Sequence, residues 1–216
     1  MTLSFLDTHS LITQDKNFGQ YLVKKFPYTE HTLGRYKPFR VNYGNILVVS
    51  SGITLKEYKV NAESSYYEFR TPHDVIFNPH KDDELTVRSL KKAKIKVFQH
   101  KQVMDTLESD GLLQHFFLEQ LSHNLSEIKE QFGIRNMNVR DRVKLIIIQL
   151  ARLNQVAFQM DGLFIPETLN NVEISKFCDC SRGYVSETLN YLKKLNIIIK
   201  RNGGWVIDDL DRMMKA

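Results

Sequence analysis

The only two cysteines of this 216-residue chain stand one residue apart, in the stretch "FCDCSRGYVSETLNYLKKL" (177–195). Thiolates at Cys178 and Cys180 could serve metal binding or thiol redox chemistry. However, a structural zinc site needs four ligands, and an iron–sulfur cluster is normally held by four thiolates. The nearest histidine in the sequence, His123, lies more than fifty residues away. We therefore expect no metal site here, and a thiol switch at Cys180 is the alternative to simple packing.

A pair of short helices accounts for the same stretch without sulfur chemistry. Apolar residues at helical spacing can fill the inner angle of such a pair, and they are Ile174, Phe177, Val185, Leu189 and Leu192. Asp179 lies at the break, where a residue that tolerates positive φ is needed. Ser181 suits the N-cap of the second helix. The sequence therefore predicts helices over 170–178 and 181–195, with the cysteines filling small apolar spaces.

The first half of the chain contains short apolar runs that are separated by turn residues. These runs are "ILVV" (46–49), "ITLKEYKV" (53–60), "YYEFRT" (66–71), "DVIF" (74–77), "ELTVRS" (84–89) and "AKIKVF" (93–98). Short strands at such regular intervals are typical of an antiparallel sandwich or barrel. We therefore predict a β-rich domain over residues 1–109.

The last third of the chain has the pattern of helices followed by short strands. "NVRDRVKLIIIQLARLN" (138–154) is apolar along one face and offers Asn138 as its N-cap. Asp161-Gly162 and Asn202-Gly203-Gly204 each lie between apolar residues, which is the signal of a β-hairpin. Helices closed by a hairpin are the layout of a winged helix-turn-helix, which we place at residues 138–216.

One long helix followed by a hinge is predicted between these two parts, over residues 110–137. Its apolar residues are spaced by three and four, and they are Leu118, Leu121, Leu125, Ile128 and Phe132. Such a stripe faces either the chain's own core or the same helix of a second chain, and the stripe alone does not decide between them. Because the other positions are polar, we predict a dimerisation helix.

The stretch after Cys178 resembles the recognition helix of the Crp/Fnr family of bacterial transcription regulators. The matching residues are Cys180, Ser181, Arg182, Val185, Leu189, Leu192 and the pair Ile197-Ile198. The order of elements along the whole chain is similar as well. The resemblance implies an α+β protein with an antiparallel β-barrel of the cyclic-nucleotide-binding-like jelly-roll type, a long dimerisation helix and a C-terminal winged helix-turn-helix.

The resemblance also implies roles for residues of the second helix and the wing. Base reading falls to Arg182, Gly183, Ser186 and Glu187, and phosphate contacts fall to Ser181, Tyr184, Asn190, Lys200 and Arg201. Arg182 is the clearest base-reading candidate, because arginine can donate two hydrogen bonds to a guanine. The family's usual glutamate is Gly183 here, and its second common arginine is Glu187. Lys193 and Lys194 are expected on the solvated back of the helix.

The effector region departs further from the family pattern. Members that bind cyclic AMP carry a Gly-Glu pair followed by Arg-Ser, whereas residues 71–89 contain no glycine. Arg88-Ser89 lies later in the chain than the motif, and the aligned Asp83 and Glu84 would repel a phosphate. This pattern resembles a divergent, PrfA-like branch that lacks the nucleotide motif. We therefore expect no cyclic nucleotide and no cofactor, and either an unknown small-molecule or protein effector or none.

Composition limits the other classes of protein. No apolar run reaches the ~18 residues that a membrane span requires, and the N-terminus lacks an export signal. We therefore expect a cytoplasmic protein without a membrane partner. His73 and His80 do not form the His-x-His signature of a cupin metal enzyme, so we expect no enzyme.

The distribution of charge favours a nucleic-acid partner. The net charge of +5 permits such a partner without requiring it. Residues 176–201 contain six basic side chains against two acidic ones, which favours DNA moderately. We expect a homodimer that binds an imperfect palindrome in double-stranded DNA and works with RNA polymerase. The alternative is a winged-helix module that binds protein and does not bind DNA specifically.

Overall fold

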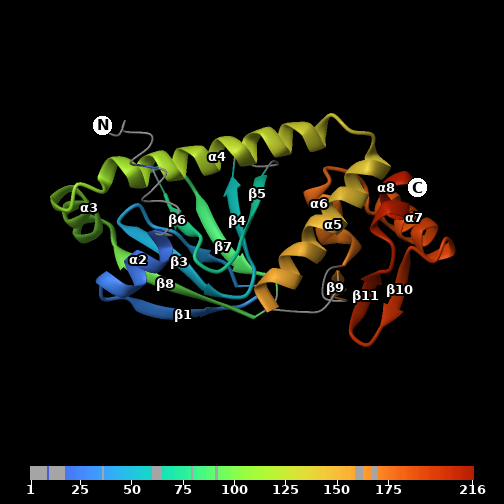
Figure 1. Ribbon diagram of the computed structural model, residues 1–216, viewed down its shortest axis with the longest axis horizontal. Helices are drawn as coiled ribbons and strands as arrows, with labels where there is room; N and C mark the ends of the chain where they lie inside the picture. Colours follow the sequence, from blue (N-terminus) through green and yellow to red (C-terminus); the bar gives the residue numbers. More distant parts are fainter. Residues whose placement is uncertain are drawn as a thin grey trace, which may run out of the picture. The chain divides into compact units, whose positions relative to one another are not determined.

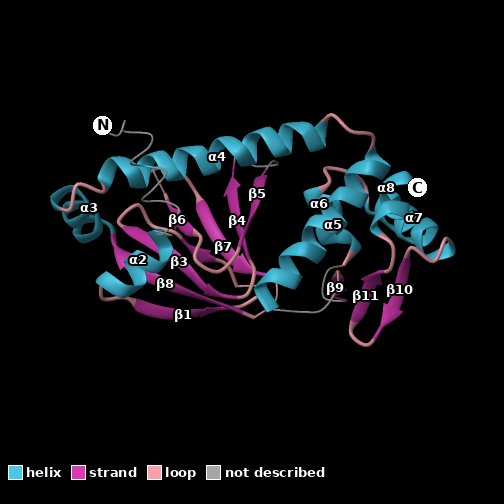
Figure 2. Cartoon of the chain, viewed as in Figure 1, coloured by secondary structure: helices cyan, strands magenta, loops and turns pink. Residues whose placement is uncertain are grey.

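In a computed structural model of the chain, the described residues are His9, 18–35, 37–59, 65–78, 80–90, 92–158, 163–166 and 170–216. They form two compact units, residues 1–126 and 127–216. The first unit contains two sheets and their covering helices, and the second contains a group of helices with a small sheet (Figure 1). Figure 2 shows the same division by type of element, with long strands only in the first unit.

Two four-stranded antiparallel sheets build the first unit. The strands of one sheet, in order across it, are β1 (Thr29–Leu33), β8 (Ala93–Gln99), β3 (Asn45–Ser51) and β6 (Val75–Phe77). The strands of the other are β2 (Phe39–Arg40), β7 (Leu85–Ser89), β4 (Thr54–Lys59) and β5 (Ser65–Arg70). All six predicted strands are confirmed. The described strands form two sheets and do not close into one barrel.

The position of strand β3 between two buried clusters explains why its sequence is continuously apolar and does not alternate with polar residues. Side chains of a strand point to opposite faces in turn. Ile46 and Val48 lie in a core cluster with the helices of this unit. Leu47 and Val49 lie in a second cluster, which also contains side chains of the other sheet. Both faces of β3 are therefore buried, as a continuous apolar run permits.

Helices cover the outer face of the β3 sheet. They are α2 (Phe18–Lys25), α3 (His100–Ser109) and the start of α4 (Leu113–Arg135). Their buried side chains in the shared cluster are Phe18, Leu22, Val103, Leu107 and Phe116. The sequence did not predict α2 or α3. It also placed the start of the long helix too early, because Gly111, with a φ of 68°, separates α3 from α4.

The second unit is a winged helix-turn-helix, as predicted. It contains α5 (Val139–Phe158), β9 (Phe164–Pro166), α6 (Asn171–Phe177), α7 (Arg182–Lys194), β10 (Ile198–Arg201), β11 (Gly204–Ile207) and α8 (Leu210–Lys215). Asn138 caps α5 as expected, since its Oδ1 accepts a hydrogen bond from the Asp141 amide at 3.0 Å. The predicted hairpin at 202–204 is confirmed by the pairing of β10 with β11.

The other predicted hairpin, around Asp161-Gly162, lies mostly outside the described residues. Helix α5 continues to Phe158, and β9 pairs with β11, so the wing is a three-stranded sheet. The two turn residues themselves lie outside the described residues. Close approach of β9 to β11 depends on Gly204, because a Cβ there would collide with the Ile165 carbonyl oxygen and the Phe164 ring.

Candidate nucleic-acid interface

Hydrogen bonds at the helix ends fix the turn between α6 and α7. Asn170 caps α6, where its Oδ1 accepts from the Glu173 amide at 2.9 Å. Asp179 takes a φ of 47° at the break between the helices. Ser181 caps α7, where its Oγ accepts from the Tyr184 amide at 3.4 Å. The predicted roles of Asp179 and Ser181 in this turn are confirmed.

The cysteines of the turn have the surroundings of packing residues. Cys178 is fully buried, and this burial raises the pKa of its thiol to about 12. Cys180 is half-buried, and burial raises the pKa of its thiol as well. Raised pKa values disfavour the thiolate that acts as ligand or nucleophile. Within the described part of the chain, no group of three His, Cys, Asp or Glu side chains is placed to hold a metal ion.

Helix α7 presents one face to its own unit and the opposite face to solvent. Val185, Thr188 and Leu192 are buried at spacings of three and four. The predicted base-reading and phosphate residues of the helix lie elsewhere on it: Arg182, Gly183, Tyr184, Glu187 and Asn190 are exposed, and Ser186 is half-buried. An exposed first turn with one arginine suits insertion into a DNA groove. The side chains that the sequence grouped for base reading therefore share one accessible region.

The wing adds basic side chains beyond the end of α7. Lys200 and Arg201 are both exposed on β10, and exposed basic side chains are of the kind that contacts phosphates. The Nζ of Lys193 lies 4.0 Å from the centre of the Trp205 ring, and that of Lys200 lies 5.9 Å from it. Lys194 is exposed as predicted. The prediction for Lys193 is wrong, because this side chain packs on the wing and not on a solvated back.

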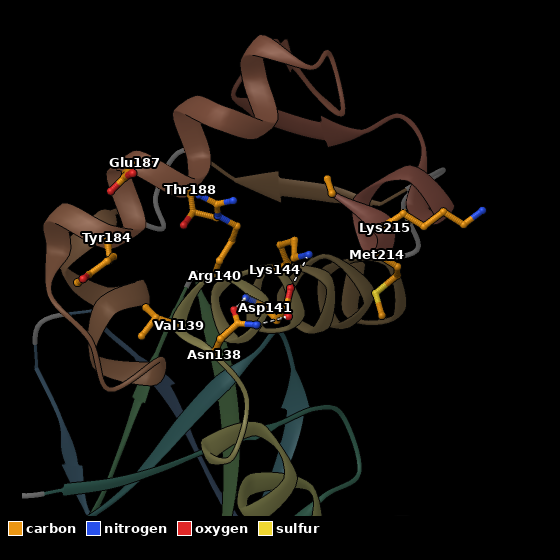
Figure 3. Close-up of a pocket in the computed structure, with 11 residues that line it drawn as sticks. Asn138, Val139, Arg140, Asp141, Lys144, Tyr184, Glu187, Thr188, Met214 and Lys215 are labelled. Atoms are coloured by element: carbon orange, nitrogen blue, oxygen red, sulfur yellow. Dashed lines mark hydrogen bonds and ion pairs between the residues drawn. The ribbon is translucent and has the colours of Figure 1, made fainter.

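A hollow of about 720 Å³ lies beside α7. Figure 3 shows Tyr184, Glu187 and Thr188 of α7 on one side of it and the first turns of α5 on another, with residues of α8 at its edge. Its basic side chains are Arg140, Lys144 and Lys215. Lys144 is buried and pairs with Asp141 at 2.6 Å, which holds the pKa of that carboxyl below its usual range.

Sequence reasoning missed the basic residues of this hollow. The guanidinium of Arg140 lies 4.8 Å from the centre of the Tyr191 ring, so α5 contacts α7 through a cation–π pair. Only the fold brings Arg140 close to Tyr191, since fifty residues separate them in the chain. The sequence signal that could have found Arg140 is a cation in the first turn of a helix, where cations are not favoured by the helix dipole.

The apolar stripe of α4 is mostly exposed within a single chain. Leu121, Leu125, Ile128 and Phe132 are 55%, 49%, 57% and 69% exposed, and Leu118 is half-buried. Phe117, which the sequence analysis did not select, continues the exposed stripe by one more turn. An apolar surface of this length is unusual on the outside of a soluble monomer. The stripe crosses the division between the two units after Ser126, and the described residues of a single chain leave most of it exposed.

Residues of the segment that aligns with the family's nucleotide motif make their contacts within the β-rich unit itself. The Asp74 carboxylate accepts from the Thr71 amide at 2.7 Å and closes a turn in which His73 has a φ of 77°. Ser89 is buried, and its hydroxyl donates to the Leu33 carbonyl at 3.1 Å. Glu84 pairs with Lys59 at 3.1 Å. These groups therefore stabilise the β-rich unit.

A chain of buried charges lies below α4 in the same unit. Glu68 accepts from Lys56 and from Arg70 at 2.8 Å each. The other terminal nitrogen of Arg70 lies 2.8 Å from Nε2 of His123 on α4. Because a guanidinium only donates, the imidazole nitrogen is the acceptor in this contact. These contacts therefore hold α4 against the sheet.

No helix among the described residues has both the length and the apolar character needed to cross a membrane.

Comparisons with known proteins find similar structures but no similar sequence. No protein-family model and no curated protein matches the sequence. FixK2 from Bradyrhizobium japonicum is 12% identical, with 88% of this chain and 97% of that chain covered and a TM-score of 0.72. A protein from Eubacterium rectale, described as a transcriptional regulator of the Crp/Fnr family, is 11% identical, with 97% and 100% covered and a TM-score of 0.67.

A third similar structure is a cyclic nucleotide-binding domain containing protein from Listeria monocytogenes. It is 14% identical, with 90% of this chain and 99% of that chain covered and a TM-score of 0.67. The coverage extends across both units in all three cases. The predicted fold is therefore confirmed: this chain has the Crp/Fnr fold, in which a cyclic-nucleotide-binding-like domain precedes a helix-turn-helix domain.

Proposed function

We propose that this chain, which has the fold of the Crp/Fnr regulators, is a cytoplasmic transcription regulator that binds a specific DNA sequence. The observation that carries the proposal is the exposed first turn of α7, where Arg182 is held next to the N-cap Ser181. In this position the guanidinium can donate to O6 and N7 of one guanine. Exposed Lys200 and Arg201 on the wing supply phosphate contacts that fix the orientation.

The proposed assembly is a homodimer. Pairing of two α4 helices would cover the exposed stripe and would carry two recognition helices. Two such helices enter successive major grooves about 34 Å apart, so the operator is an imperfect palindrome. Residues 1–109 act as the sensor, 110–137 as the dimerisation helix and hinge, and 138–216 as the DNA-binding domain. RNA polymerase is the further partner, and the sensor belongs to the PrfA-like type without a nucleotide motif.

The test compares two single substitutions on an operator that is selected from a random duplex library. Arg182→Ala removes a base contact, so it should weaken operator binding by roughly 1–3 kcal/mol per half-site and weaken scrambled DNA much less. Lys200→Ala removes a phosphate contact, so it should weaken both duplexes about equally and reduce the salt dependence of binding. Titrations of both variants at several salt concentrations measure these effects.

The outcome separates the proposal from its alternative. A wild-type protein that selects no sequence from the library would leave the winged helix as a protein-binding module. Equal losses on both duplexes for Arg182→Ala would make Arg182 a backbone contact and shift base reading to Ser186 or Glu187. Lys194→Ala is the matched control, because Lys194 is an exposed lysine that lies at the far end of α7.

A further inference from the structure

One guanidinium in the second unit donates to the ends of two different helices. Arg142 lies in the first turns of α5 and is half-buried. Its Nη1 donates to the carbonyl oxygens of Cys178 at 2.9 Å and Asp179 at 3.3 Å. Its Nη2 donates to the carbonyl oxygens of Arg135 at 3.1 Å and Met137 at 3.1 Å. All five residues belong to the same compact unit.

The four acceptors lie at or directly after the C-terminal ends of two helices. Arg135 is the last residue of α4, and Met137 lies in the junction that follows it. Cys178 is the C-cap of α6, and Asp179 is the residue with positive φ at the break before α7. Carbonyl groups at helix C-termini lack intrahelical donors, and the helix dipole favours a cation beside them. The planar guanidinium of arginine carries donors on both terminal nitrogens, so it can donate to two such helix ends at once.

We infer that Arg142 is a positioning residue that couples the end of the dimerisation helix to the turn that aims the recognition helix. The two segments share one donor group, so a displacement of residues 135–137 must lengthen hydrogen bonds on one side of the guanidinium or carry residues 178–179 along. Helix α7 begins only three residues after Asp179. A change at the end of α4 is thereby transmitted to the helix that carries Arg182. This inference rests on the proposed function and adds a route of regulation to it.

The proposed coupling predicts which backbone amides exchange faster when Arg142 is lost. The Met137 amide donates to Ile134 at 3.2 Å, and the Cys180 amide donates to Ser175 at 3.1 Å, so both amides are protected from hydrogen exchange. If Arg142 links the two segments, its loss releases both of them together. If Arg142 only supports the unit in general, its loss speeds exchange throughout the helices of residues 139–216.

The experiment measures hydrogen exchange by NMR in the full chain of Arg142→Gln and Arg142→Lys. We expect exchange at Met137 and at Cys180 to rise at least tenfold in both variants, while the buried amides of α7 near Leu192 change less than twofold. Arg152→Gln is the control, since Arg152 is exposed on the same helix. A rise at only one of the two sites, no rise, or a uniform rise across the unit would each overturn the coupling.

A second readout links the coupling to DNA. Arg142→Lys should lower affinity for the selected operator at least tenfold without changing the oligomeric state, because α7 loses its fixed direction. Unchanged affinity in a variant that has lost protection at both sites would contradict the transmission to α7. If the wild-type chain selects no operator, the proposed function fails, whereas the exchange experiment still decides whether Arg142 couples the two segments.

Discussion

Arg182 and Gly183 are neighbours in the first turn of α7, yet the fold constrains them differently. Arg182 follows the N-cap directly, and its side chain is exposed. Gly183 is exposed as well, and a Cβ there would meet only Ser181 Oγ at 3.5 Å, which is ordinary contact. Its backbone does not have positive φ. Nothing in the folded chain therefore requires glycine at this position.

This freedom gives a prediction for Gly183. Gly183→Ala should raise the free energy of unfolding by up to about 0.5–1 kcal/mol, because glycine is a poor helix former, and should leave operator affinity unchanged. Gly183→Glu should add a base preference at one position of each half-site, since a carboxylate can accept from a cytosine amino group. Urea unfolding and a duplex competition assay measure the two effects. Weaker binding of the alanine variant would instead indicate that the backbone at 183 approaches the DNA closely.

Glu119 is an acidic side chain whose pKa the fold shifts strongly. It lies half-buried on α4, where burial and then the nearby carboxylate of Asp74 raise its pKa from 4.5 to about 7. Between these two pH values the folded chain holds a proton that the unfolded chain has released. The contribution of Glu119 to stability is therefore fully present below about pH 4.5 and is lost as the pH rises through about 7.

Glu119→Gln should remove this pH dependence. At about pH 8 the variant should be more stable than the wild type by about 1–2 kcal/mol, after allowance for partial solvent exposure of the carboxyl. The advantage should disappear at about pH 4.5. Urea unfolding across this pH range measures the effect, with the exposed Glu108→Gln as the control. An advantage that persists at low pH would mean that packing, and not ionisation, separates the two proteins.

At the scale of elements, helix α4 leaves a stripe of large apolar side chains exposed to solvent. Its exposed apolar side chains are about half accessible, so completing their burial would gain each of them roughly half of the ~1.5–3 kcal/mol for full burial. A second copy of the same helix offers the matching surface, because residues spaced by three and four form the seam of paired helices. The stripe alone left two readings open in the sequence, and exposure in the folded chain favours the dimer.

We predict that the wild-type chain is a dimer at micromolar concentration and that Leu125→Glu with Ile128→Glu makes it a monomer. Charges in the seam would be buried without partners, which is costly. Ser122→Glu with Ser126→Glu adds the same charge at exposed positions off the stripe and should leave the dimer intact. Multi-angle light scattering measures the mass. A wild-type chain that is already monomeric would contradict the dimer.

At the scale of the whole molecule, the sequence predicted the elements that carry strong local signals. The helix-turn-helix was readable because Asp179, Ser181 and the spacing of Val185 and Leu192 each have a local reason. The strands from β3 to β8 were readable from short apolar runs between turns. The comparisons confirm the fold that the resemblance implied, while the residues assigned to DNA contact stay predictions.

The missed elements have weak local signals and are stabilised by packing. Strand β1 reads "TEHTL", and only Leu33 of it is buried, so it lacks the alternation of a half-buried strand. Helix α3 has no side-chain cap at Gln99, and its buried residues are only Val103 and Leu107. The links made by Arg142 depend on carbonyl groups from distant parts of the chain. Such contacts exist only after the fold has formed, so no sequence pattern reveals them.

The two adjacent glycines of the wing divide the hairpin into a fixed root and a variable tip. Gly204 is fixed by the strand beside it, whereas a Cβ at Gly203, with a φ of 80°, would have no neighbour within 4 Å. Residues inserted between Arg201 and Gly203 would therefore extend into solvent without disturbing the pairing of β11 with β9. The length of the wing can thus change while the root of the hairpin stays the same. Wing length is accordingly a feature that evolution, or an engineer, can change independently of α7.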